Sequence, residues 1–309
     1  MSLSIVVLAG GDSHERPISL ASGAEAATAL RKSGMRVEVY DPAGCHLEDI
    51  PWNQFDGCFI ALHGGAGEDG RVQLQLEELH VPYTGSDPLA SRVAMSKAAS
   101  KERFLQAGVP TPAYAIHRHG AALDAFFDRV DLLGYPVAVK PDGQGSSLGV
   151  GRAFQRDELT ACVTDSGRFD RYVVAESWVE GREFTVALLG RRPLPLLEIV
   201  KPREVFDYDA KYRDASATYR FDTGLPAEQM QALQHAAIAA AETLGTAGLV
   251  RVDLMLDGAG QPWVLEVNTV PGLTRTSLAP KAAARAGLGL SGLCTWMLRD
   301  ALGPQSAAA

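Results

Sequence analysis

Two carboxylates and one amide in consecutive apolar-rich segments form the strongest chemical pattern in the sequence. Asp253 lies in the first segment, Glu266 and Asn268 lie in the second, and a Gly/Pro-containing turn joins them, which is typical of a β-hairpin. With the turn centred between Ala259 and Gly260, Asp253 pairs with Glu266 and Arg251 pairs with Asn268 on one face. Oxygen ligands grouped in this way suit a hard cation such as Mg²⁺, completed by water and nucleotide phosphates. A solvent-exposed hairpin with chance acidic residues is an equally good interpretation of these positions alone.

The same alternation predicts which side chains of the hairpin are buried. On the face opposite the carboxylates the sequence places apolar residues. We expect these side chains to contribute to a core: Val252, Leu254, Leu265 and Val267.

A second pattern could bind a polyphosphate. Lys140 ends an expected strand over residues 135–140 and is followed by a glycine- and serine-rich stretch, residues 142–149. Backbone N–H groups, the hydroxyls of Ser146 and Ser147 and the lysine ammonium are the donors that phosphate groups need. The glycine spacing matches neither the Walker A motif nor the dinucleotide-binding fingerprint. A plain surface turn explains the stretch equally well when it is considered alone.

Two loops could hold the charged ends of a small substrate. Glu15 follows the first expected strand, at the edge where parallel sheets present ligand-binding loops, so it could bind an ammonium group or be a solvated acid. Gly272 could let the backbone approach a ligand, and amide groups at Ser277 and Leu278 could bind a carboxylate at a helix start. Ser277 could also serve as an ordinary N-cap residue.

A polar and aromatic segment over residues 206–212 is expected to be a loop. Lys211 could reach a terminal phosphate, and Tyr212 could offer its hydroxyl to a substrate. Exposed loops of this composition commonly have no such role, so both interpretations stay open.

Composition excludes several classes of protein. The 309 residues include 29 Lys and Arg and 37 Asp and Glu, a formal net charge of −8, which argues against a nucleic-acid partner. No apolar run approaches the roughly 18 residues of a membrane span, so no membrane association is expected. Four widely spaced cysteines indicate reduced thiols and a cytoplasmic protein.

In the first 86 residues, which include Glu15, expected strands and helices alternate along the chain. Strands expected over 4–9, 37–40 and 58–62, with helices between and after them, indicate a parallel sheet. The first helix is expected to bury one apolar face, and a single long helix is expected over residues 89–106. The expected buried face of the first helix comprises Leu20, Ala24, Ala27 and Leu30.

The C-terminal half reads differently, because several strands follow one another without a helix between them. The fold class is therefore α/β, with α+β organisation in the C-terminal half. Strands are expected over 173–176, 184–189, 194–199, 249–256 and 263–268, and a helix over 227–244.

The order of these patterns along one chain resembles the D-alanine:D-alanine ligases of the ATP-grasp superfamily. The most specific part is Leu-Glu-Val-Asn-Thr-x-Pro-Gly over 265–272, followed by Thr-x-x-Ser-Leu over 274–278, and the resemblance covers nearly the whole chain. It implies three domains. They are an N-terminal parallel-sheet, Rossmann-like substrate-binding domain (1–86), a central ATP-grasp domain (87–176) and a C-terminal ATP-grasp domain with metal and substrate sites (177–309).

The resemblance also implies an activity. Members of this family join two D-alanine molecules through an acylphosphate, with release of ADP and phosphate, for peptidoglycan precursor synthesis. ATP is the implied co-substrate, together with two Mg²⁺ or Mn²⁺ ions, and a monovalent cation is a further candidate. The implied assembly is a cytoplasmic homodimer.

Individual roles follow from the resemblance, position by position. Residues implied in ATP binding are Lys97, Lys140, Ser147, Glu176, Trp178, Val179, Glu183 and Lys211. Residues implied as metal ligands are Asp253, Glu266 and Asn268. Residues implied in catalysis are Glu15, Ser146, Lys211, Tyr212, Arg251 and Gly272. Residues implied in binding the amino-acid substrates are Glu15, His63, Ser277 and Leu278.

Four positions depart from the family pattern without removing an implied metal ligand or phosphate-binding lysine. Gln144 stands where a Glu is usual, so it keeps hydrogen bonding but loses a charge. The other departures are Thr276 in place of His, Phe206 in place of Tyr, and Leu74 in place of Gly.

Other functions stay open at this point. An ATP-grasp ligase that joins a different carboxylate and amine is the nearest alternative, because the fold does not determine the substrate. An oxidoreductase on the N-terminal sheet would bind NAD(P) without Mg²⁺, but the dinucleotide fingerprint is missing after the first strand. A nucleotide-binding regulator would bind ATP and form no dipeptide.

Overall fold

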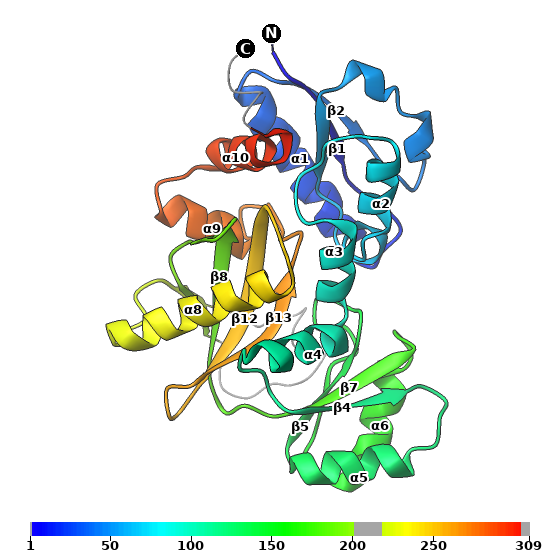
Figure 1. Ribbon diagram of the computed structural model, residues 1–309, viewed down its shortest axis with the longest axis vertical. Coiled ribbons are helices and arrows are strands. Elements are labelled where there is room, and N and C mark those ends of the chain that lie inside the picture. The colour runs from blue at the N-terminus through cyan, green and yellow to red at the C-terminus, as the bar shows by residue number, and fades with distance from the viewer. Residues whose placement is uncertain (1, 201–217, 304–309) are drawn as a thin grey trace.

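The N-terminal sheet is parallel, as predicted. The computed structural model describes residues 2–200 and 218–303 (Figure 1). Its first sheet has the strand order β2–β1–β3. Past its first residue β1 is wholly buried, which accounts for its unbroken apolar sequence. The elements of this part are β1 (Ser4–Leu8), α1 (Arg16–Lys32), β2 (Arg36–Tyr40), β3 (Gly57–Ile60), α2 (Arg71–Glu78) and three 3-10 helices, η1 (Leu47–Asp49), η2 (Trp52–Gln54) and η3 (Gly65–Gly67).

The buried face of α1 differs from the predicted one. Leu20 is 43% exposed and Ala24 is also exposed, so the prediction is wrong at these two positions, whereas Leu30 is buried as expected. Gly23 explains the difference, because a Cβ atom there would lie 2.3 Å from the Cβ of Ala9. The helix therefore approaches the sheet through its smallest residue, and Leu20 is turned away.

The single helix expected over residues 89–106 is in fact two helices. α3 (Pro88–Met95) and α4 (Lys97–Ala107) meet at Ser96, whose backbone is extended at φ −85° and ψ 112°. The Ser96 hydroxyl accepts a hydrogen bond from the backbone N–H of Ala99 at 3.1 Å and so caps α4. This break places Lys97 in the first turn of a helix.

The central sheet is antiparallel, with the strand order β4–β7–β5–β6. Figure 1 shows α5 and α6 on one side of it. The sequence patterns do not predict β4 or β6, which are short and contain charged residues. The elements are β4 (Tyr114–Arg118), α5 (Asp124–Leu133), β5 (Val137–Pro141), β6 (Gly151–Ala153), α6 (Arg156–Ser166) and β7 (Tyr172–Ser177).

The third sheet is also antiparallel and has the order β11–β10–β8–β12–β13, with β9 paired to β8. Helix α8 packs on it, and side chains of α8, β8, β12 and β13 share one hydrophobic core. The elements are β8 (Gly181–Leu189), β9 (Arg192–Pro193), β10 (Leu197–Val200), β11 (Thr218–Arg220), α8 (Ala227–Thr243), β12 (Leu249–Asp257) and β13 (Pro262–Asn268).

The last two helices return to the N-terminal part of the molecule. α9 (Leu278–Arg285) and α10 (Leu290–Leu302) contribute to one hydrophobic core with Ile5 and Leu30. The strands of the first and third sheets lie within two of the predicted ranges, β7 of the central sheet ends at Ser177, one residue past the expected boundary at 176, and the domain boundaries themselves stay a prediction. Over the described residues, no helix has the length and apolar character required to cross a membrane.

Candidate active site

The predicted pairing across the hairpin is confirmed. Asp253 lies opposite Glu266 and Arg251 lies opposite Asn268, so these four residues share one face of the β12–β13 ribbon. Between Asp253 and Leu254 the register of the β12–β13 pair shifts by one residue. The carboxylates therefore stand at the edge of a β-bulge.

The bulge makes one predicted core position wrong. Leu254 pairs with Val264 and not with Leu265, and Val264 is the fully buried residue, while Leu265 is half-buried. Strict alternation assumes an unbroken ladder, and an extra residue in one strand reverses the faces beyond it. Val252 and Val267 are buried as expected.

Asp253 is held by cationic and hydroxyl donors. Arg251 donates through Nε to Oδ1 at 2.9 Å and through a terminal nitrogen to Oδ2 at 2.8 Å. Thr185 of β8 donates its hydroxyl to Oδ1 at 2.6 Å. Burial opposes the charge of Arg251, but the Asp253 carboxylate raises the pKa of that guanidinium above its ordinary value. Thr185 is not predicted by the sequence patterns, because its place here depends on strand pairing with Asp253.

Lys97 balances the second carboxylate. Its Nζ lies 3.6 Å from Oε2 of Glu266 and donates to the backbone oxygen of Gln144 at 2.7 Å. The Glu266 side chain keeps 37% of its surface exposed. Lys97, Glu266, Asn268 and Gln144 line one small cavity, together with Glu68. The structure therefore brings a predicted phosphate-binding lysine and two predicted metal ligands to one place.

A buried carboxylate of the central sheet forms ion pairs with two lysines. Glu176, only 3% exposed, forms ion pairs with Lys140 and, at 2.8 Å, with Lys101. Burial by itself raises the pKa of Glu176, yet the two lysines outweigh it and lower that pKa to about 2. Lys101 is not among the predicted residues, because a lysine on a helix ordinarily faces solvent.

The glycine- and serine-rich loop reaches the N-terminal part of the molecule. Ser146 donates its hydroxyl to Glu15, which confirms that these two predicted residues lie together. Ser146 and Ser147 both have positive φ angles, 52° and 55°, a conformation that non-glycine residues rarely adopt. A Cβ on Gly145 would lie 2.9 Å from Oε2 of Glu15, so the missing side chain allows this approach.

The base of the same loop is tied to α4. Asp142 accepts hydrogen bonds from the Ser96 hydroxyl and from the Ala98 backbone N–H, both at 2.7 Å. The Gln144 side chain donates to the Phe169 backbone oxygen at 3.1 Å. The loop is therefore anchored at one end and is in contact with Glu15 at its tip.

His63 is a buried junction between distant segments. Its Nδ1 lies 2.9 Å from the backbone oxygen of Val270, and its Nε2 lies 2.8 Å from the hydroxyl of Ser22. The Ser22 hydroxyl also accepts from the Leu273 backbone N–H at 3.1 Å. Glu68 lies 3.8 Å from His63, and burial raises the pKa of that carboxyl despite the histidine. Both ring nitrogens of His63 are occupied, and its predicted contact with substrate stays a prediction.

The start of α9 has the close approach that its sequence predicts. Ser277 occupies the N-cap position but makes no capping hydrogen bond with its side chain, and Leu278 is the first helical residue. The Ser277 hydroxyl accepts from the Thr274 backbone N–H at 3.1 Å instead. A Cβ on Gly272 would lie 2.7 Å from Ser277 Oγ, so a side chain there would crowd this turn.

The remaining predicted residues lie around the passage from the central to the third sheet. Trp178 and Val179 follow the end of β7, and Glu183 lies near the start of β8, opposite Met255 of β12. The Trp178 backbone N–H donates to the Pro136 oxygen at 3.1 Å. Three residues singled out by the sequence analysis lie outside the described residues: Phe206, Lys211 and Tyr212.

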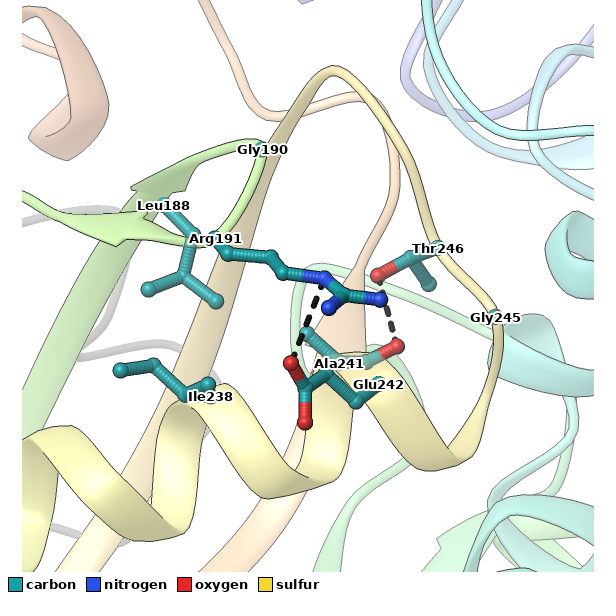
Figure 2. A pocket seen from close by; sticks show the side chains of 8 residues that line it. All are labelled: Leu188, Gly190, Arg191, Ile238, Ala241, Glu242, Gly245 and Thr246. Carbon is teal, nitrogen blue, oxygen red and sulfur yellow. Dashed lines mark hydrogen bonds and ion pairs between the residues drawn. The ribbon is translucent and has the colours of Figure 1, made fainter.

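A second cavity lies between the end of β8 and the end of α8 (Figure 2). Arg191 and Glu242 form an ion pair of 3.3 Å at its rim. None of the predicted site residues lines it, so it is separate from the candidate active site.

The fold and the site together define an ATP-grasp protein, because a lysine-bearing antiparallel sheet and its glycine-rich loop face a second sheet that carries paired carboxylates. A family model described as the D-ala D-ala ligase C-terminus matches residues 104–299. The chain is 43% identical over 297 residues to a D-alanine--D-alanine ligase of Aromatoleum aromaticum, covering 96% of this chain and 95% of that protein. It is 42% identical to the corresponding Marinobacter nauticus protein, covering 96% and 91%.

Solved structures agree with the sequence matches. The D-alanine--D-alanine ligase from Bacillus anthracis superposes with a TM-score of 0.88 at 36% identity and covers 97% of this chain and 98% of that one. The structure of the Bacillus anthracis ligase complexed with ATP gives a TM-score of 0.84 at 32% identity, covering 97% and 98%. The chain therefore belongs to the D-alanine–D-alanine ligase family.

Proposed function

We propose that this chain joins two D-alanine molecules with ATP and releases ADP and phosphate, in the synthesis of peptidoglycan precursors. The observation that carries the proposal is a 43% identity to a D-alanine--D-alanine ligase over 96% of the chain. The contact between Ser146 and Glu15 supports it, because it joins the glycine-rich loop to the proposed substrate residue. The chain is thus an ADP-forming carboxylate–amine ligase.

ATP binds between the central and the third sheets in this proposal. Lys97 and Lys140 contact its phosphates, and the 3.6 Å between Lys97 and Glu266 supports a shared phosphate and metal region. The ribose is bound by Glu183. Glu176, Trp178 and Val179 lie around the adenine. Ser147 and Lys211 are the remaining ATP-binding residues.

Asp253, Glu266 and Asn268 would hold divalent metal ions. Their oxygens lie on one face of the hairpin, and carboxylate and amide oxygens are the donors that Mg²⁺ or Mn²⁺ prefers, so the residues fit such a group. When bound, the metal neutralises phosphate charge and polarises the transferred phosphoryl group. Arg251 and Lys97 balance the two carboxylates in the structure. A monovalent cation is a further candidate.

The reaction proceeds in two steps. The carboxylate of the first D-alanine attacks the γ-phosphorus of ATP, ADP leaves, and an acylphosphate results. The amine of the second D-alanine then attacks the carbonyl carbon, loses a proton, and phosphate leaves. Lys211 offsets charge on the transferred phosphoryl group in the first step. Arg251 and the Gly272 backbone N–H stabilise the tetrahedral oxyanion in the second.

Each D-alanine is held by groups at opposite ends of the cleft. Glu15 binds the ammonium of the first, in a hydrogen-bonded set with Ser146 and Tyr212. The backbone amides of Ser277 and Leu278 bind the carboxylate of the second at the start of α9, where the Ser277 side chain does not cap the helix. His63 lines this substrate region.

Two loops close over the site in this proposal, residues 143–149 and 207–212. Closure excludes water, which would hydrolyse the acylphosphate before the amine attacks. Gln144 lacks the charge that a Glu would bring, so loop closure and its pH dependence are the properties that this departure alters. Assembly as a homodimer, a cytoplasmic location and the domain boundaries at 86 and 176 complete the proposal.

A dipeptide assay tests the function. Purified protein is incubated with ATP and Mg²⁺ and with D-alanine, L-alanine, or D-alanine plus D-lactate, and phosphate and condensation products are quantified. We expect phosphate release that depends on D-alanine and yields D-alanyl-D-alanine. Turnover with L-amino acids, or NAD(P) binding without ATP turnover, would overturn the assignment.

A further inference from the structure

Lys101 is a completely buried lysine that the proposed reaction does not use. Its side chain is 0% exposed, so the ammonium cannot contact a nucleotide in the cleft. Its Nζ instead meets three oxygens: Glu176 Oε2 at 2.8 Å, the Thr111 hydroxyl at 2.8 Å and the Pro112 backbone oxygen at 3.3 Å. A buried charge of this kind requires a full set of partners, and here they come from β7 and from the segment just before β4.

One side of this cluster leads to the third sheet. Thr111 accepts from Lys101 and donates its own hydroxyl to the Val264 backbone oxygen at 2.8 Å. The Val264 backbone N–H donates to the Pro110 oxygen at 2.8 Å. Val264 is the residue at which the hairpin register shifts, two positions before Glu266. The Lys101 cluster is thus hydrogen-bonded to the strand that carries the proposed metal ligands.

The other side leads to the proposed phosphate-binding lysine. Glu176 of β7 contacts Lys101 with one oxygen and Lys140 of β5 with the other. Two ammonium groups and one carboxylate leave this trio with a net positive charge. Without Lys101, Lys140 would be the only ion-pair partner of Glu176 among residues 2–200 and 218–303, and the charge that Lys140 offers to a phosphate would be neutralised.

We propose that Lys101 and Thr111 are positioning residues for the nucleotide: the chain Lys140–Glu176–Lys101–Thr111–Val264 fixes the phosphate-binding lysine relative to the strand of Glu266. Lys101 also shares the Glu176 charge and so keeps Lys140 available to the phosphates. This inference rests on the proposed role of Lys140 in ATP binding.

The experiment measures ADP affinity directly. Lys101→Met, Thr111→Val and the double variant are compared with the wild type by calorimetric titration with ADP in the absence of divalent metal. Matched controls are Lys32→Met, at an exposed position of α1, and Thr164→Val, at an exposed position of α6. Thermal unfolding of each variant reports stability separately, and steady-state assays give KM for ATP and for D-alanine.

The expected result has three parts. Lys101→Met weakens ADP binding and raises KM for ATP by about tenfold, because a desolvated charge interaction is lost, while KM for D-alanine changes by less than about twofold. Thr111→Val has a smaller effect in the same direction, about threefold. The double variant resembles Lys101→Met alone, because Thr111 acts through Lys101, so the two effects do not multiply.

Two outcomes would overturn the inference. ADP affinity in folded Lys101→Met equal to that of Lys32→Met would remove the role of Lys101, and multiplying effects in the double variant would break the chain. If Lys101→Met does not fold, the inference is tested by comparing ADP affinity in the near-isosteric Thr111→Val with that in its control, Thr164→Val. Lys140→Met separates the two levels: if it weakens ADP binding and the positioning variants do not, only this inference fails; if it has no effect, the proposed nucleotide site fails.

Discussion

The two sides of the cleft balance their charges in different ways. On the central sheet a single buried carboxylate, Glu176, lies between Lys101 and Lys140, and all three side chains are mostly or fully buried. On the hairpin Glu266 is 37% exposed, and its cation is a lysine from another element, 3.6 Å away. The ion pairs of the central side are part of the buried core. On the hairpin side, a metal ion can replace Lys97 as the partner of Glu266, and a phosphate can replace Glu266 as the partner of Lys97. Removing charge should therefore affect stability on the first side and catalysis on the second.

Glu266→Ala gives the largest expected effect, and it falls on activity. The loss of one metal ligand is expected to reduce turnover by at least about 10³-fold, since metal coordination contributes several kcal/mol to the transition state. Stability should change by less than about 1 kcal/mol, because Glu266 is 37% exposed and Lys97 keeps its hydrogen bond to the Gln144 backbone oxygen. Phosphate release and urea unfolding measure the two quantities. Glu242→Ala, which removes an exposed ion pair between α8 and the turn joining β8 to β9, is the matched control, and near-normal turnover in Glu266→Ala would refute the metal assignment.

Glu176→Gln is expected to reduce stability more than Glu266→Ala does, so the larger effect falls on folding and not on turnover. It leaves two buried ammonium groups without their carboxylate, and breaking a buried ion pair in this way costs about 3–5 kcal/mol. Urea unfolding should show this loss in Glu176→Gln and less than about 1 kcal/mol in Glu266→Gln. Equal destabilisation of the two variants would remove the distinction between the buried and the exchangeable side.

The stability lost in Glu176→Gln is expected to depend on pH. Burial raises the pKa of Glu176, but Lys101 and Lys140 lower it further, from an ordinary 4.5 to about 2 in the folded protein. A lowered folded-state pKa stabilises the protein fully above the unfolded pKa, and the stabilisation fades as pH falls toward the folded pKa. The difference in unfolding free energy between wild type and Glu176→Gln should therefore be constant above about pH 5 and shrink between pH 4.5 and 2. A difference that is independent of pH across this window would contradict the ion-pair account.

The smallest expected effect is on the stability of two variants at the bulge, and it tests the register of the hairpin. Val264→Ala should cost about 2 kcal/mol because Val264 is fully buried, whereas Leu265→Ala should cost about 1 kcal/mol or less despite the larger residue removed. Chemical denaturation of the two variants measures both values. A larger cost at Leu265 would favour the unbroken alternation that the sequence alone predicts.

Local patterns in the sequence were sufficient for the hairpin and the parallel sheet. Alternation about the expected turn correctly pairs Asp253 with Glu266 and Arg251 with Asn268, but nearer the turn Leu254 pairs with Val264, one residue from its expected partner. The pairs at the carboxylates therefore match the expectation only because the bulge lies between them and the turn. The bulge was not predictable in this way, since one extra residue leaves the composition of the strand unchanged. The break at Ser96 was better signalled, because a serine three residues before the capped amide of Ala99 is a typical N-cap pattern.

Contacts between distant segments could not be predicted from such patterns. His63 and Val270 are 207 positions apart and meet through one hydrogen bond, and Thr111 meets Val264 across 153 positions. The spacing of Lys97 and Lys101 places both on one side of α4, which was the available signal that Lys101 also faces inward. Its burial follows from the sheet that α4 covers, and only the assembled fold shows that.

The most direct test of the two-sided cleft is the affinity for ADP with and without Mg²⁺, measured in the wild type and in Glu266→Ala. We expect Mg²⁺ to strengthen ADP binding in the wild type and to have no such effect in Glu266→Ala. Without metal, binding in Glu266→Ala should be no weaker than in the wild type, because the lysines of the central side are intact and Lys97 is released from its carboxylate. An undiminished Mg²⁺ effect in Glu266→Ala would refute a metal site on the hairpin.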